Sequence, residues 1–158
     1  MKWSVPINDR VSLLYAKSAY SFLEDKDTEL KTSFMNGLKE SVEYLVYSNP
    51  SINKRLCSPL ISKENKIYLL NEIFNKKLDE NVLGFLSILV QRNRFDFLAS
   101  ICTAFFNIVD EKAGILKGEV RLAKKIDKKR EEEIISSLSG IIGRKVKPDF
   151  IEDTSLLA

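Results

Sequence analysis

The segment 82–90 is apolar around almost its whole circumference if it forms a helix, and this limits how the chain can fold. Seven of its nine residues are apolar, namely Val82, Leu83, Phe85, Leu86, Ile88, Leu89 and Val90. A helix on the surface of a bundle needs an apolar stripe over only about a third of its circumference. The surplus must therefore be covered by other helices of the same chain or by a partner.

Up to about residue 113 the chain has the pattern of a helical bundle. Apolar residues recur three and four positions apart, the spacing of one helical face. Helices are expected to start near Asp9, Thr28, the Ser62 cap and Asp79, and to stop at Asn49-Pro50 and at the Ser58-Pro59 break. A last helix is expected from about Phe95 to Lys112. On the first helix the expected core face is Val11, Leu14, Tyr15, Ala19, Phe22 and Leu23.

The period changes at Gly114, which stands where a left-handed helix cap belongs. Residues 115–123 alternate between apolar and charged, which is typical of a half-buried strand. Asp127 is expected to cap a helix that ends at Gly143, and alternation resumes over 144–151. In this second strand Pro148 suits an edge or a bulge better than a central position.

The expected fold class is therefore mainly α. An amino-terminal six-helix bundle over residues 1–113 is followed by a small α+β module over residues 114–158.

Composition excludes several classes of function. The chain has no histidine, so the commonest general base and the commonest zinc ligand are both absent. No phosphate-binding loop is present, and Cys57 and Cys102 are far apart and are expected to be packing residues. No apolar run approaches the roughly twenty residues of a membrane span. We expect no catalytic, cofactor-binding or metal-binding residues and no direct membrane insertion.

The charge pattern does not require a nucleic-acid partner. The 25 Lys and Arg residues are balanced by 22 Asp and Glu residues. Five basic residues lie within 124–130, but Glu131, Glu132 and Glu133 follow at once, which indicates a solvated helix with ion pairs three or four positions apart. An all-helical RNA-binding or protein-adaptor module is the alternative class, and the salt dependence of binding would distinguish an RNA-binding module.

The first helix is also apolar over more than one face, through Leu13, Tyr15, Ala16, Ala19, Tyr20 and Phe22. Two such helices indicate a groove that accepts an amphipathic helix of another protein. The alternative is that 82–90 is a central helix surrounded by its own chain. Aspartate at Ala19 or Leu86 distinguishes the two: it weakens partner binding if a groove exists and unfolds the bundle if the residues are core.

Three ordered motifs resemble the ATP synthase delta subunit family, whose mitochondrial relative is the oligomycin-sensitivity-conferring protein. They are LLYAKSAYSFL (13–23), LCSPLISKENKIYLLNEIF (56–74) and FLSILVQRNRFDFLASICTAFFNIVDEKAGILKGEVRLA (85–123). The resemblance covers essentially the whole chain. It implies a non-catalytic stator subunit of a proton-translocating F-type ATP synthase, peripheral on the cytoplasmic face of the bacterial inner membrane or on the matrix side in mitochondria.

The resemblance also implies the partners. A groove between the first and fifth helices takes the amino-terminal helix of an alpha subunit, and the small module holds the b subunits of the peripheral stalk, with no nucleic acid involved. The groove residues expected from this are Tyr15, Ala16, Ala19, Tyr20, Leu83, Leu86, Ser87, Val90 and Arg94. Arg94 either binds a carboxylate of the partner or, with Asn93, supports the helix junction. Family members continue beyond the segment that matches 153–158, so the module is expected to be truncated at its carboxy end.

Overall fold

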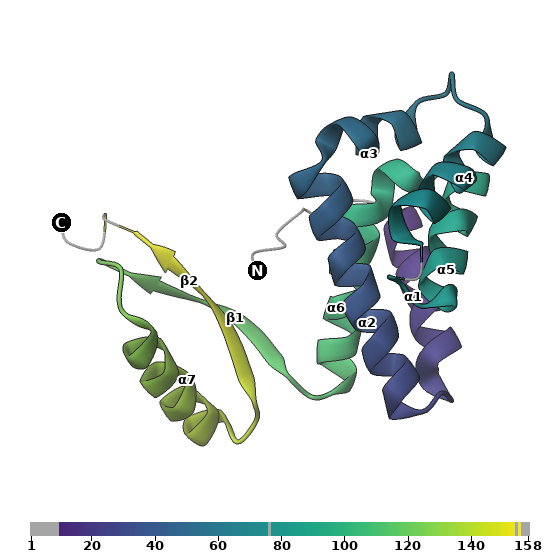
Figure 1. Cartoon of the computed structure of the whole chain (residues 1–158). Coiled ribbons are helices and arrows are strands. Elements are labelled where there is room, and N and C mark those ends of the chain that lie inside the picture. The colour runs from purple at the N-terminus through teal and green to yellow at the C-terminus, as the bar shows by residue number, and fades with distance from the viewer. Residues whose placement is uncertain (1–9, 76, 154, 156–158) are drawn as a thin grey trace. The chain divides into compact units, whose positions relative to one another are not determined.

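The computed structural model describes residues 10–75, 77–153 and 155, and the chain forms two compact units, 1–108 and 109–158. The bundle consists of α1 (Arg10–Glu24), α2 (Thr28–Val42), the π-helical η1 (Glu43–Ser48), α3 (Pro50–Cys57), α4 (Lys63–Phe74), α5 (Glu80–Gln91), the 3-10 turn η2 (Phe95–Phe97) and α6 (Leu98–Lys112). The module consists of β1 (Leu116–Leu122), α7 (Lys128–Ile142) and β2 (Val146–Glu152). The predicted fold class is confirmed (Figure 1).

Side-chain caps start the helices where the sequence predicts them. The side-chain oxygens of Ser62, Asp79 and Asp127 accept hydrogen bonds from backbone amides two or three residues later, at 3.3, 2.8 and 2.8 Å. Such bonds satisfy amide groups that have no partner within the helix. Asp27 caps α2 in the same way at 2.7 Å, and the predicted cap at Asp9 lies outside the described residues.

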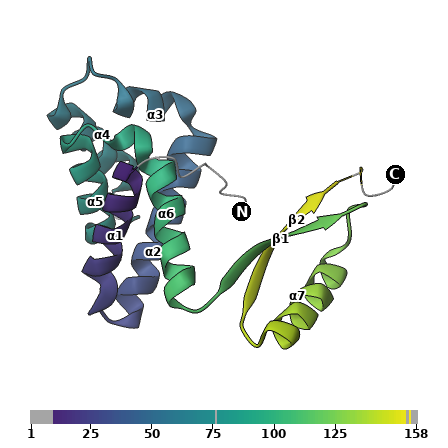
Figure 2. The ribbon, with the colours of Figure 1, turned by 180° about the vertical axis from the view of Figure 1, so that it is seen from behind.

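The centre of the bundle is the ring of Phe34 on α2, which is 1% exposed. The rings of Phe22 on α1, Phe85 on α5 and Phe105 on α6 lie around it, with centroids 6.3, 6.0 and 6.0 Å away. Figure 1 shows α2 and α4 on the near side of the bundle, and Figure 2, seen from behind, brings α1 and α6 to the near side. One aromatic side chain therefore joins four helices.

The absence of a side chain at Gly37 allows α2 and α5 to approach closely. A Cβ atom at this position would lie 2.8 Å from Cγ2 of Val82, which is fully buried. That separation is below van der Waals contact, and a stiff buried valine has little freedom to move away. Gly37 thus sets the spacing between these two helices.

The end of α5 explains the Asn93-x-Arg pattern in the central motif. Asn93 has a positive φ of 53°, its amide donates to Val90 O at 3.1 Å, and the amide of Arg94 donates to Leu89 O at 2.8 Å. These two bonds with a left-handed residue between them form a Schellman motif, which satisfies the last carbonyls of the helix. The predicted junction role of Asn93 is confirmed.

Asn93→Gly should therefore be neutral or stabilising, whereas Asn93→Val should lower the free energy of unfolding by about 1–2 kcal/mol, because a β-branched residue is strained at positive φ. Urea unfolding followed by far-ultraviolet circular dichroism measures both changes. Equal stability of the glycine and valine variants would contradict this role of the positive φ.

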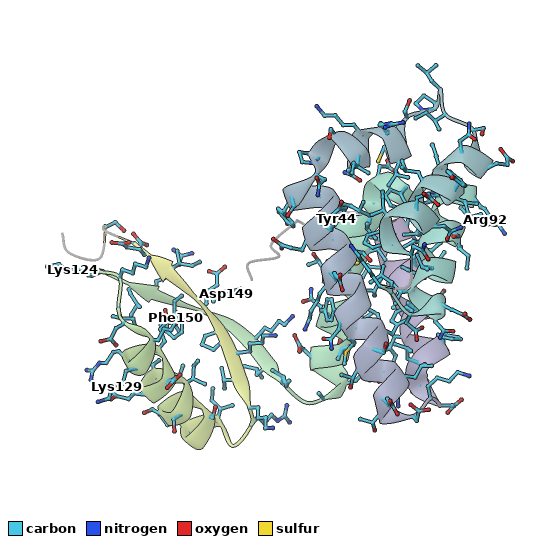
Figure 3. The ribbon with its side chains drawn as sticks, viewed as in Figure 1. Tyr44, Arg92, Lys124, Lys129, Asp149 and Phe150 are labelled. Atoms are coloured by element: carbon cyan, nitrogen blue, oxygen red, sulfur yellow. The ribbon has the colours of Figure 1, made fainter. Side chains whose placement is uncertain are left out.

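The module contains a two-stranded parallel sheet in which Leu116 pairs with Val146 and Val120 with Phe150. The predicted alternation is confirmed on β2, where Val146, Pro148 and Phe150 are half-buried between exposed neighbours, and Phe150 lies between β2 and α7 (Figure 3). On β1 it is confirmed only towards the end, since Leu116 is 41% exposed. Among the described residues the sheet has two strands, so each one is an edge, which accommodates Pro148 as predicted.

Both predicted helix-ending glycines adopt the left-handed conformation, with φ of 68° at Gly114 and 69° at Gly143. The predicted packing role of Cys102 is also confirmed, because this side chain is fully buried and burial raises the pKa of its thiol to about 12. Cys57 is half-buried, and burial together with the nearby Asp96 carboxylate raises its thiol pKa. Neither thiol is activated as a nucleophile.

Candidate functional site

The helix α5 is covered mostly by its own chain. Val82, Leu86, Leu89 and Val90 are at most 1% exposed, and the helix packs against α4, α2 and η2. This face accounts for the greater part of the apolar surplus in 82–90. The remainder is limited to the flanks, where Leu83, Phe85 and Ser87 are half-buried and Ile88 is 47% exposed.

The helix α1 buries only part of the predicted core face, including Ala19 and Leu23. Its buried residues are Ser12, Ala16, Ala19 and Leu23, whereas Leu14 is 64% and Phe22 is 45% exposed. The predicted core position Leu14 is therefore wrong, whereas Phe22 lies at the edge of the core, partly exposed although its ring contacts Phe34. Three of the four buried side chains are small, and small side chains allow a helix axis to approach its neighbours closely.

The nine predicted groove residues fall into three groups. Ala16, Ala19, Leu86 and Val90 are buried at 0 to 4% exposure, Tyr15, Tyr20, Leu83 and Ser87 are half-buried, and Arg94 is exposed. The buried group holds the helices in position. Only the half-buried and exposed groups are accessible to a partner.

The geometry brings α1 and α5 to the same part of the bundle. Phe22 of α1 and Phe85 of α5 both contact the ring of Phe34. Tyr15 and Tyr20, however, lie on opposite flanks of α1, because five residues correspond to a rotation of about 140°. Leu83 and Ser87 are one turn apart and share one flank of α5.

Four exposed apolar residues of α1 and α5 were not among the predicted groove residues, namely Leu13, Leu14, Phe22 and Ile88. Periodicity assigned Leu14 to the core face, because a leucine three or four positions from other apolar residues matches that pattern. Counting apolar positions around the whole helix would have shown that Leu14 is more apolar surface than one core face can cover. Together these residues extend the accessible apolar surface of α1 and α5.

Positive charge gathers at the carboxy-terminal end of α5. Lys63 of α4 donates from Nζ to the carbonyl of Gln91 at 2.7 Å, and Arg94 donates from Nη1 to the carbonyl of Asn93 at 3.4 Å. Arg92 is exposed at the same end of the helix (Figure 3). Cations stabilise the negative end of a helix dipole, and all three remain available to an acidic group. Arg94 thus contacts the junction and is also exposed.

The described part of the chain offers no site for bond-making chemistry that we can identify. Within residues 10–75, 77–153 and 155 no three Cys, Asp or Glu side chains gather as a metal site would require. Over the same residues no helix is both long enough and apolar enough to cross a bilayer. Apolar helix flanks and a cluster of cations are features of a surface that binds other proteins.

Comparisons with known proteins agree on one family. A family model described as "ATP synthase delta (OSCP) subunit" matches residues 11–158. The ATP synthase subunit delta of Chlorobium chlorochromatii is 28% identical over 91% of this chain and 79% of its own length, and that of Desulforamulus reducens is 28% identical over 93% and 80%. A chain in the mitochondrial ATP synthase hexamer of Toxoplasma gondii has a similar fold, with a TM-score of 0.59 and 22% identity over 93% of this chain and 81% of that one.

Proposed function

The chain belongs to the ATP synthase delta (OSCP) subunit family, a family of non-catalytic subunits, and from this membership we propose that it is a stator subunit joining the catalytic head of an F-type ATP synthase to its peripheral stalk. The observation that carries the proposal is the family match over residues 11–158, which includes both the bundle and the module. In this role the chain resists rotation of the head, so that torque drives ATP synthesis.

The bundle is proposed to bind the amino-terminal helix of an alpha subunit. The accessible flanks of α1 and α5 support this, because Leu13 and Tyr20 on α1 and Leu83 and Ser87 on α5 lie beside the buried residues of their own helices. An amphipathic helix binds such a surface through apolar anchors at helical spacing. Arg92 and Arg94 would attract acidic residues of that helix.

The module is proposed to hold the b subunits. The resulting complex would place the chain peripherally, on the cytoplasmic side of a bacterial membrane or the matrix side of a mitochondrial one. The exposed face of α7 does not favour an RNA-binding function, because Arg130 is paired with Glu133 at 3.1 Å, one of the ion pairs three or four positions apart that the sequence predicts.

A peptide with the sequence of the amino terminus of the cognate alpha subunit tests the proposed contact. We expect saturable binding to the wild-type chain, and about tenfold or greater weakening by Leu13→Asp on α1 and Ser87→Asp on α5, because each places a carboxylate in an apolar contact. Isothermal titration calorimetry measures the affinities, and circular dichroism checks that the helices persist.

Tyr68→Asp on α4 is the matched control, since Tyr68 is 67% exposed and lies on a helix outside the proposed contact. The control should bind like the wild type. Absence of binding by the wild type, or equal weakening by all three substitutions, would remove the support for this surface.

A further inference from the structure

A buried carboxylate joins the last turn of α6 to both strands of the module. The side chain of Asp110 is only 12% exposed, and its Oδ2 lies 2.7 Å from Nζ of Lys117 on β1 and 3.6 Å from Nζ of Lys147 on β2. All three residues belong to the same compact unit, which begins at Val109.

The two lysines lie directly opposite each other in the parallel ladder. Like charges at facing positions destabilise a sheet, and the carboxylate of Asp110 offsets this repulsion at side chains that are 41% and 68% exposed. Side chains along a strand point alternately to the two faces of the sheet, and the residues next to Lys117 and Lys147 lie on the α7 side. Both lysines therefore lie on the face that α7 does not cover. Asp110 thus secures the open face of the sheet at the start of both strands.

The backbone strengthens this connection. The carbonyl of Asp110 accepts a hydrogen bond from the amide of Ile115 at 2.8 Å, and the amide of Gly114 donates to Glu111 O at 3.0 Å. With Gly114 in the left-handed conformation these bonds form a second Schellman motif, which leads directly from α6 into β1. Asp110 therefore fixes the turn through its backbone and the two strands through its carboxylate.

We propose that Asp110 is the positioning residue through which mechanical load on the module passes into α6. This inference rests on the proposed stator function and deepens it, because it assigns force transmission to one carboxylate. Without that charge, the two lysines repel each other and the strands loosen from the end of α6, while the bundle stays folded.

The first test measures amide hydrogen exchange in the full chain by mass spectrometry. In Asp110→Asn we expect exchange about tenfold faster in 116–122 and 146–152, with no change in 98–105. Glu111→Gln, at the exposed neighbouring carboxylate, should leave both strands unchanged. Asp110→Glu and the double variant Asp110→Asn/Lys147→Met should restore protection, because one returns the anion and the other removes one of the facing cations. Strand exchange no faster than in Glu111→Gln would overturn the inference.

The second test uses the cognate ATP synthase reconstituted in vesicles with and without the subunit. With Asp110→Asn we expect the subunit to co-purify and ATP hydrolysis to continue, while the ratio of proton pumping to hydrolysis falls and is restored by Asp110→Glu. If omission of the whole subunit leaves this ratio unchanged, the stator function itself fails. If omission lowers it but Asp110→Asn couples like the wild type, the stator function stands and the role of Asp110 is wrong.

Discussion

Phe34→Ala is expected to lower the free energy of unfolding of the bundle by about 3–5 kcal/mol, the range for removing a buried aromatic side chain. Its ring is the contact shared by Phe22, Phe85 and Phe105, so four helices lose their common neighbour at once. A domain of this size is stable by about 5–15 kcal/mol, so the loss would leave a marginal fold. Urea unfolding monitored at 222 nm measures the change.

Tyr68→Ala provides the comparison, because this aromatic residue of α4 is 67% exposed. Exposed substitutions usually change stability by less than about 0.5 kcal/mol. If Phe34→Ala proves no more destabilising than Tyr68→Ala, Phe34 is not the centre of the core. Phe34→Leu should fall between the two, because it refills part of the cavity.

Leu86→Asp is expected to abolish the cooperative unfolding transition of the bundle. Leu86 is fully buried in α5, and an unpaired carboxylate at such a site carries a desolvation penalty of several kcal/mol. Ile88→Asp is a close control, because it makes a similar change two residues along the same helix at a position that is 47% exposed. Its circular dichroism spectrum and unfolding midpoint should stay close to those of the wild type.

This pair of variants also resolves the two interpretations of the apolar segment 82–90. A folded Leu86→Asp protein that loses only peptide binding would show that Leu86 faces a partner and would contradict the packing described above. Loss of folding assigns Leu86 to the core. Partner binding then has to be tested at accessible positions such as Ser87.

Much of the local structure could be predicted from the sequence. The caps at Ser62, Asp79 and Asp127 and the left-handed ends at Gly114 and Gly143 depend on a side chain and the few backbone groups beside it. The change from helical to strand period at Gly114 is equally local. The resemblance to the ATP synthase delta family was visible as well, because the order and spacing of its motifs extend along most of the chain.

Tertiary structure decided which faces of these elements are covered. Periodicity could not show that α1 buries Ser12 and Ala16 and leaves Leu14 exposed, because that choice depends on how closely other helices approach. The parallel pairing of β1 with β2, which brings Lys117 and Lys147 together at Asp110, joins residues thirty positions apart. The type and ends of a helix or strand can be predicted from a single sequence, because they depend on hydrogen bonds between near neighbours. Burial depends on contacts between distant segments, which exist only once the chain has folded.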